Sequence, residues 1–129
     1  MTNPFSLKLF FLLKVPMLLL SGARVKEFSA DQCVAEMPYK HINRNPFKSM
    51  YFAVQGMVAE LATAGLVMLA KEHFKENIAF IVVDVDANFF KKITEKVAFT
   101  CADYNLIEGK IQEAVTSGQA AVVRTKSVG

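Results

Sequence analysis

The chain has 129 residues, of which 53% are hydrophobic, and 15 basic and 12 acidic side chains give it a formal net charge of +3. This length predicts one domain of ordinary size, residues 1–129, and the hydrophobic content excludes an intrinsically disordered chain. The positive excess is too weak for a dedicated nucleic-acid-binding protein, but it is compatible with an anionic small ligand.

Residues 1–20 form an apolar lead-in that contains two lysines and two prolines. Lys8, Lys14 and Pro16 interrupt it, so no apolar run reaches the roughly 18 to 20 residues that a membrane-spanning helix needs. The lysines lie inside the apolar stretch and not before it, unlike the charges of a signal peptide. We expect residues 4–14 to form an amphipathic helix that packs on the domain, with docking to a membrane surface as the alternative.

Two strands and a loop are expected next. Residues 23–29 (ARVKEFS) alternate between apolar and polar side chains, as a half-buried strand does. Residues 33–39 (CVAEMPY) are a second strand candidate, which Pro38 ends. Residues 41–48 are polar and contain an Asn-Pro pair, which is typical of a loop.

A long helix is predicted over residues 49–72, with Ser49 as its N-cap. Its alanines, leucines and methionines favour helix, and a helix that is apolar nearly all round is a buried one. Helical spacing places its bulkiest side chains on one core face, which comprises Met50, Val54, Met57, Val58, Leu61 and Met68.

The rest of the chain supplies segments that can wrap this helix. Strands are predicted over residues 78–90, 96–102 and 119–128, and a short helix over 104–116. The fold class is therefore α+β, an antiparallel sheet curled around one central helix. The chain ends soon after the last predicted strand, so we expect a further strand to be missing and one sheet edge to be bare.

The two cysteines indicate neither a metal site nor a disulfide framework. Cys33 and Cys101 lie far apart, outside any Cys-x-x-Cys or Cys/His cluster. We expect both to be reduced core residues of a cytoplasmic protein. Neither His41 nor His73 has a metal-ligand partner at helical spacing, and no cofactor motif is found.

Glu60 is the first candidate catalytic residue. It is a single acid inside the apolar helix, on a stripe of small side chains that includes Ala53, Gly56 and Thr63. Small side chains allow a ligand or another backbone to come close, and a desolvated carboxylate is a candidate general base or nucleophile. The alternative is that this face reaches solvent and Glu60 is simply hydrated.

Asn45 and the start of the helix are the second feature. The Asn45 amide is able to orient a water or a carbonyl, although an ordinary Asx turn is the alternative. The helix start near Ala53 offers unpaired backbone N–H groups, which stabilise an oxyanion where one develops. Every helix start has such groups, so this signal alone is not specific.

With these residues in place, the chain resembles the hotdog-fold acyl-CoA thioesterases. The phenylacetyl-CoA thioesterase type has an Asn, a Gly three positions later, His-Gly-Gly after that, and an acid fifteen positions after the Asn. Asn45 and Glu60 have this separation, with Lys48 at the Gly position and residues 51–53 (YFA) in place of His-Gly-Gly. The segment from Asn45 to Glu60 is more similar still to an uncharacterised branch of this superfamily, which has the Ser-Met-Tyr-Phe-Ala sequence found here at residues 49–53. Residues 84–93 (DVDANFFKKI) also resemble the family.

The resemblance implies a homodimer or tetramer with sites at the dimer interface, where Glu60 of one subunit faces the helix start of the other. Glu60 would activate water or attack the thioester. The N–H of Ala53, with that of Phe52, would bind the thioester oxygen, while Asn45 would position the carbonyl or water. The substrate is an acyl-CoA or acyl-carrier thioester, and no cofactor is implied. The other substrate-binding residues implied are Tyr51, Gly56, Thr63 and Arg44, with Lys91 and Lys92 near the phosphates of CoA.

Three other functions compete with hydrolysis. A hotdog dehydratase needs a His about fourteen residues before the acid, where this chain has Pro46. A module that binds acyl or pantetheine groups without hydrolysing them is favoured by bulky Tyr51 and Phe52. A structural interaction domain would use only the dimer interface, because fold does not fix function.

Overall fold

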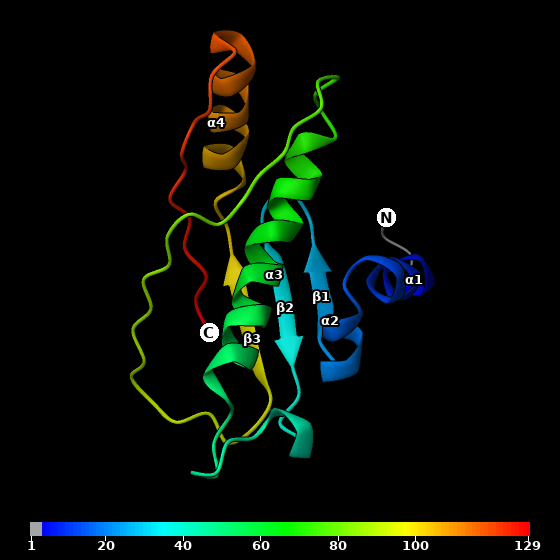
Figure 1. Cartoon of the computed structure of the whole chain (residues 1–129), viewed down its shortest axis with the longest axis vertical. Helices are drawn as coiled ribbons and strands as arrows, with labels where there is room; N and C mark the ends of the chain where they lie inside the picture. Colours follow the sequence, from blue (N-terminus) through cyan, green and yellow to red (C-terminus); the bar gives the residue numbers. More distant parts are fainter. Residues whose placement is uncertain (1–3) are drawn as a thin grey trace.

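A long apolar helix lies across a three-stranded antiparallel sheet in this computed structural model (Figure 1). Apart from five side chains in the first helix, the structure describes residues 4–129. The elements, in chain order, are α1 (Pro4–Lys14), α2 (Pro16–Ser21), β1 (Arg24–Phe28), β2 (Cys33–Met37), a 3₁₀ turn (His41–Asn43), α3 (Phe52–Lys71), β3 (Val97–Cys101) and α4 (Tyr104–Ser117).

The sheet has the order β1-β2-β3, and both neighbouring pairs are antiparallel. Its central strand β2 is almost wholly buried, since α3 covers it. Cys33 lies opposite Cys101 and Met37 lies opposite Val97, which fixes the register of β2 and β3. The strands predicted at residues 23–29, 33–39 and 96–102 are therefore confirmed, each within two residues at either end.

The core forms where α3 meets the sheet and α4. The buried residues of α3 recur at helical spacing and comprise Val54, Val58, Ala62, Leu66, Val67 and Ala70. Of the predicted core face, Met50 is also buried, whereas Met57, Leu61 and Met68 are half-buried. The predicted fold class is confirmed: an antiparallel sheet packs on one long central helix, as in the hotdog fold.

The predicted start of the long helix was wrong by three residues. The helix begins at Phe52, and Tyr51 in extended conformation is its N-cap. Ser49 does not cap it, because the Ser49 hydroxyl exchanges hydrogen bonds with the Asn45 side chain. A short polar side chain that finds a partner in its own loop is not free to serve a helix.

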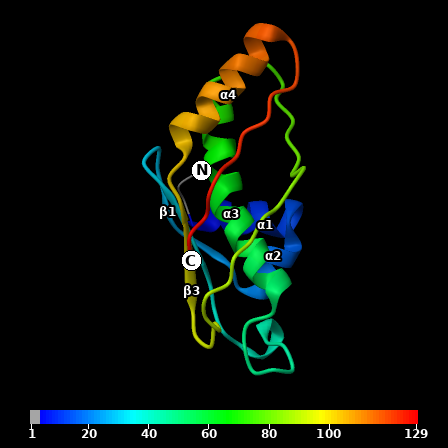
Figure 2. The same cartoon turned by 90° about the vertical axis from the view of Figure 1, so that its left-hand side faces the viewer.

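Two predicted strands are absent from the described residues. Residues 78–90 and 119–128 are extended, but their only ladder contact is one antiparallel bridge between Thr100 and Val128. Both run beside α3 without a regular strand neighbour (Figure 2). β-branched composition favours an extended backbone, but a strand also needs a partner for its N–H and C=O groups. Ile81 and Val122 accordingly remain exposed.

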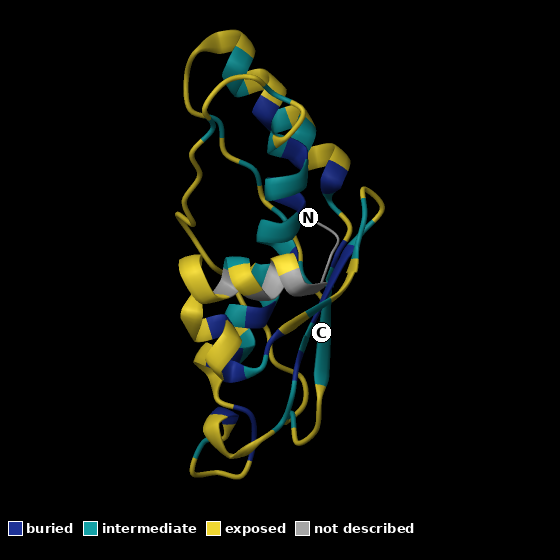
Figure 3. Cartoon of the chain, turned by 90° about the vertical axis from the view of Figure 1, so that its right-hand side faces the viewer, coloured by how far each residue is buried: buried dark blue, intermediate teal, exposed yellow. Residues whose placement is uncertain are grey.

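The lead-in contains two helices. Helix α1 has the predicted bounds, whereas α2 was not predicted; Pro16 starts it and Gly22, at φ 84°, ends it. The described part of this hairpin is largely exposed (Figure 3). Among the described residues, only α3 is long and apolar enough to cross a membrane by length and composition, and its buried face is that of a core helix.

Both cysteines are free and fully buried. Burial, with a smaller contribution from neighbouring Cys101, raises the pKa of the Cys33 thiol to about 11. Because the thiolate is the reactive form, Cys33 stays a protonated apolar packing group, as predicted for a core residue.

Two glycines of α3 make a matched pair for testing this packing. A Cβ at Gly65 would lie 2.7 Å from Cys33 Sγ, whereas a Cβ at Gly56 would meet nothing within 4 Å. We expect Gly65→Ala to lower the free energy of unfolding by about 1–3 kcal/mol through overpacking. Gly56→Ala should raise it by about 0.5–1 kcal/mol, because alanine is the better helix former. Urea denaturation of both variants measures this, and equal shifts would contradict the packing described.

Candidate functional site

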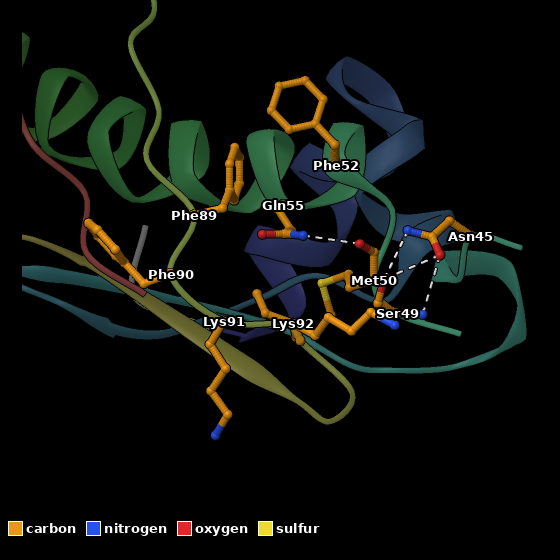
Figure 4. A pocket seen from close by; sticks show the side chains of 10 residues that line it. Asn45, Ser49, Met50, Phe52, Gln55, Phe89, Phe90, Lys91 and Lys92 are labelled. Carbon is orange, nitrogen blue, oxygen red and sulfur yellow. Dashed lines mark hydrogen bonds between the residues drawn. The ribbon is translucent and has the colours of Figure 1, made fainter. Parts of the chain in front are cut away.

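A shallow cleft of about 410 Å³, largely open to solvent, lies at the N-terminal end of α3. One wall is the loop and first turn that lead into α3, and the other is the extended segment before β3 (Figure 4). The lining residues are Asn45, Ser49, Met50, Phe52, Gln55, Phe89, Phe90, Lys91, Lys92 and Ile93. The size is within the range of small-molecule sites, and the lining combines apolar side chains with amides and two cations.

Asn45 builds the loop that precedes α3. Its Oδ1 accepts hydrogen bonds from the N–H of Phe47 at 2.9 Å and of Ser49 at 3.3 Å, and its Nδ2 donates to Ser49 Oγ at 3.0 Å. This is the Asx turn that the sequence left as an alternative. Asn45 also lines the cleft, so the same side chain shapes the loop and forms part of the cleft wall.

Lys48 explains one part of the family pattern. Its φ is 59°, in the left-handed region that favours glycine. The resembled thioesterases have a glycine at this position, so the loop in this chain keeps a glycine-like backbone with a lysine side chain.

The first turn of α3 leaves two backbone donors available. The N–H groups of Val54 and Gln55 both bond to the Tyr51 carbonyl. Within the part of the chain that the structure describes, the N–H groups of Phe52 and Ala53 have no acceptor. Such groups at a helix start, together with the positive end of the helix dipole, favour a negatively charged oxygen.

Aromatic rings and lysines form the opposite wall. Phe52 and Phe89 pack edge to face, with ring centroids 5.5 Å apart. Lys92 Nζ donates to the Phe47 carbonyl at 3.1 Å and so ties this wall to the Asn45 loop. Lys91 points away from the other lining side chains (Figure 4). None of the ten lining residues is acidic, which makes the cleft suitable for an anionic ligand.

Glu60 does not line the cleft of a single chain. It is exposed on the same side of α3 as exposed Ala53 and Gly56, seven residues and about 10 Å along the axis from Ala53. The desolvated surroundings that the sequence suggested are therefore not provided by one chain. Ala53, Gly56 and Glu60 remain uncovered on α3, whereas Ser127 contacts the helix at Ala59 and Thr63.

The other predicted site residues lie around the cleft. Tyr51 is exposed at the helix start. Arg44 is exposed, stacks over the Tyr39 ring at 5.8 Å, and contacts His41 Nδ1 at 3.1 Å. Thr63 lies farther along α3, where its hydroxyl hydrogen-bonds Ser127 Oγ at 2.9 Å. The cleft thus brings together Asn45, Phe52, Lys91 and Lys92 of the predicted residues. The predicted residues that do not line it are Tyr51, Ala53, Gly56, Arg44, Thr63 and Glu60.

Gln55 is a cleft residue that sequence reasoning missed. Its Nε2 donates to the Met50 carbonyl at 3.0 Å, which holds the side chain across the helix entry. A polar residue in the first turn of an apolar helix was the available signal. In the described part of the chain, no group of three or more His, Cys, Asp or Glu side chains is placed to hold a metal ion.

Comparison with known proteins finds likeness in structure only. No protein-family model and no curated protein matches the chain. A protein of Shewanella oneidensis, provisionally assigned as a thioesterase, is similar, with a TM-score of 0.75 and 15% identity over 96% of this chain and 83% of that one. A Pseudomonas aeruginosa protein of unknown function, for which a thioesterase role has been suggested, has a TM-score of 0.68 and 20% identity. The match covers 92% of this chain and 78% of that one. A thioesterase of Haemophilus influenzae has a TM-score of 0.62 and 19% identity, and the match covers 79% of this chain and 68% of that one. At these identities, the likeness shows a shared fold.

Proposed function

We propose, from the hotdog fold of the chain and the cleft at the start of α3, that the protein hydrolyses acyl thioesters. The observation that carries this proposal is the pair of unpaired N–H groups at Phe52 and Ala53 beside a cleft lined by Phe52 and Asn45. Thioester hydrolysis needs donors for the oxyanion and a base for water. The assignments of the three similar structures point to the same chemistry.

The proposed reaction adds water across the C–S bond. Glu60 takes a proton from a water molecule while the water oxygen attacks the thioester carbonyl. The oxygen of the resulting tetrahedral intermediate accepts hydrogen bonds from the N–H groups of Ala53 and Phe52. The C–S bond then breaks, Glu60 returns its proton to the departing sulfur, and a thiol and a carboxylic acid are released. Asn45 orients the carbonyl or the water.

The active form in this proposal is a dimer, with Glu60 supplied by one subunit to the cleft of the other. Glu60 lies two turns from the donors of its own chain, yet the part of its stripe formed by Ala53, Gly56 and Glu60 is uncovered, and a Cβ at Gly56 would meet open space. Large apolar side chains are also exposed in the extended segment after α3, where Phe90 is 96% and Ile81 81% exposed. Such exposure is typical of a surface that another chain covers.

The substrate class in this proposal is an acyl-CoA or an acyl-carrier thioester. Met50, Phe52 and Phe89 offer apolar contacts to an acyl chain, while Lys92 and Lys91 supply positive charge for phosphates. The two free, buried cysteines fit a protein of the reducing cytoplasm.

Thiol release from a panel of short, medium and aromatic acyl-CoAs tests this function directly. We expect turnover of at least one acyl class, and light scattering should give the mass of a dimer or tetramer. A monomer at micromolar concentration with no thiol release above the uncatalysed rate would overturn the proposal.

A second candidate is a module that binds acyl or pantetheine groups without hydrolysing them. The observation that favours it is the bulk of Tyr51 and Phe52, both more than half exposed at the helix start where a thioester would approach. A ligand of this class would raise the unfolding temperature without turnover. Stabilisation by acyl-CoA in the absence of any thiol release would favour this candidate.

A further inference from the structure

The hairpin of α1 and α2 carries an apolar surface that the rest of the chain leaves uncovered. We call it the α1–α2 surface and define it by five side chains that are about half exposed or more: Leu9, Leu12, Leu13, Met17 and Leu20. Single exposed leucines are ordinary. Five large apolar side chains within twelve residues are not, and such a patch marks an interaction surface.

Helix α2 is packed against the domain, so the position of the α1–α2 surface on the molecule is fixed. Leu18 and Ser21 of α2 are buried against the domain, and Ser21 Oγ donates to the Leu18 carbonyl at 2.8 Å. Gly22 ends α2 and leads directly into β1. The hairpin lies beside the β1 edge of the sheet (Figure 1), and the five side chains of the α1–α2 surface remain exposed there.

The positive charge of residues 1–26 indicates which kind of partner the α1–α2 surface binds. Residues 1–26 contain Lys8, Lys14, Arg24 and Lys26 and no acid. Lys26 forms an ion pair with Glu36 of β2 at 3.3 Å, so the excess positive charge of this segment comes from Lys8, Lys14 and Arg24. A second copy related by a two-fold axis would bring like charges together, because the same patch faces itself. An anionic lipid surface offers both an apolar layer and negative headgroups.

We propose that the α1–α2 surface docks on the surface of an anionic phospholipid bilayer. The exposed leucines and Met17 enter the boundary between headgroups and acyl chains. Lys14, exposed in the last turn of α1, extends toward the phosphates, as long basic side chains do at such boundaries. The hairpin lies in the membrane surface and does not cross it.

Sedimentation of the full chain with vesicles tests this proposal. We expect binding to phosphatidylcholine vesicles that contain phosphatidylserine, and at least about tenfold weaker binding to phosphatidylcholine alone or at high salt. Leu12→Gln with Leu13→Gln should weaken binding to both vesicle types about tenfold or more. Lys14→Glu should weaken binding to the anionic vesicles only.

Leu106→Gln is the matched control, because Leu106 is an exposed leucine on α4. It should bind vesicles like the unaltered chain, and thermal unfolding should show that all variants are folded. Absence of binding, or equal binding by the α1–α2 variants and the control, would overturn the proposal. So would a dimer that Leu12→Gln with Leu13→Gln dissociates without any vesicle binding, since the surface would then be a protein interface.

Discussion

Glu60→Gln is expected to lower kcat for thioester hydrolysis by about 10²–10⁴-fold, the usual contribution of a general base. Glutamine keeps the size of the side chain but cannot take a proton from water. The unfolding temperature should change little, because glutamine has the same size and Glu60 makes no contact with a described residue that the substitution would break. Steady-state thiol release and thermal unfolding of the same preparation measure both quantities.

Glu72→Gln is the matched control for this variant. Glu72 is the exposed C-cap residue of α3, so it carries the same charge on the same helix but lies far from the cleft. It should keep full activity. Equal rates for Glu60→Gln and the unaltered chain would remove the carboxylate from the reaction. Glu60→Ala, with the same loss as Glu60→Gln, would show that the acid itself is needed.

Ala53→Pro is expected to lower kcat by about 10²–10³-fold, as the loss of one oxyanion donor does. Proline removes the backbone N–H and adds little bulk, and the first turn of a helix tolerates it because no helical bond uses that N–H. The Ala53 N–H has no acceptor among the described residues, so no internal hydrogen bond is lost. Comparison of kcat with KM separates a lost transition-state contact from weaker binding.

Ala53→Ser is the control for the proline variant, because serine keeps the N–H and is nearly as small. It should retain most of the activity. If the serine and proline variants lose the same activity, the side chain and not the N–H is responsible, and the oxyanion role of Ala53 is wrong. Circular dichroism of the proline variant establishes that α3 still forms.

The sequence predicted the elements whose patterns do not depend on distant partners. Helix α3 followed from its composition, and β2 followed from an apolar run that α3 covers. Residues 78–90 show the limit of this reasoning. Their β-branched content predicted a strand, yet an extended segment becomes a strand only when its backbone hydrogen-bonds to a neighbouring strand. No described residue forms such a ladder with them.

The candidate site was predictable in part. The spacing of Asn45 and Glu60 predicted both as site residues, and of the two only Asn45 lines the cleft. The spacing did not show that Asn45 shapes its own loop or that Glu60 lies outside the cleft of its own chain. Ser49 was wrongly predicted to cap the helix. Its hydroxyl bonds to Asn45 instead, and that contact depends on the fold of the loop, which the sequence pattern does not show. Whether a second chain covers the Glu60 stripe is a property of an assembly, which periodicity in one chain does not encode.

Mixing the Glu60→Gln and Ala53→Pro chains tests the central claim most directly, because in a shared site each chain supplies what the other lacks. Unfolding and refolding an equal mixture gives half mixed dimers, each with one intact and one doubly altered site. Thiol release should then recover to about a quarter of the unaltered rate, although each variant alone is nearly inactive. No recovery in a mixture shown to contain mixed dimers would contradict a site in which Glu60 of one subunit serves the α3 start of the other.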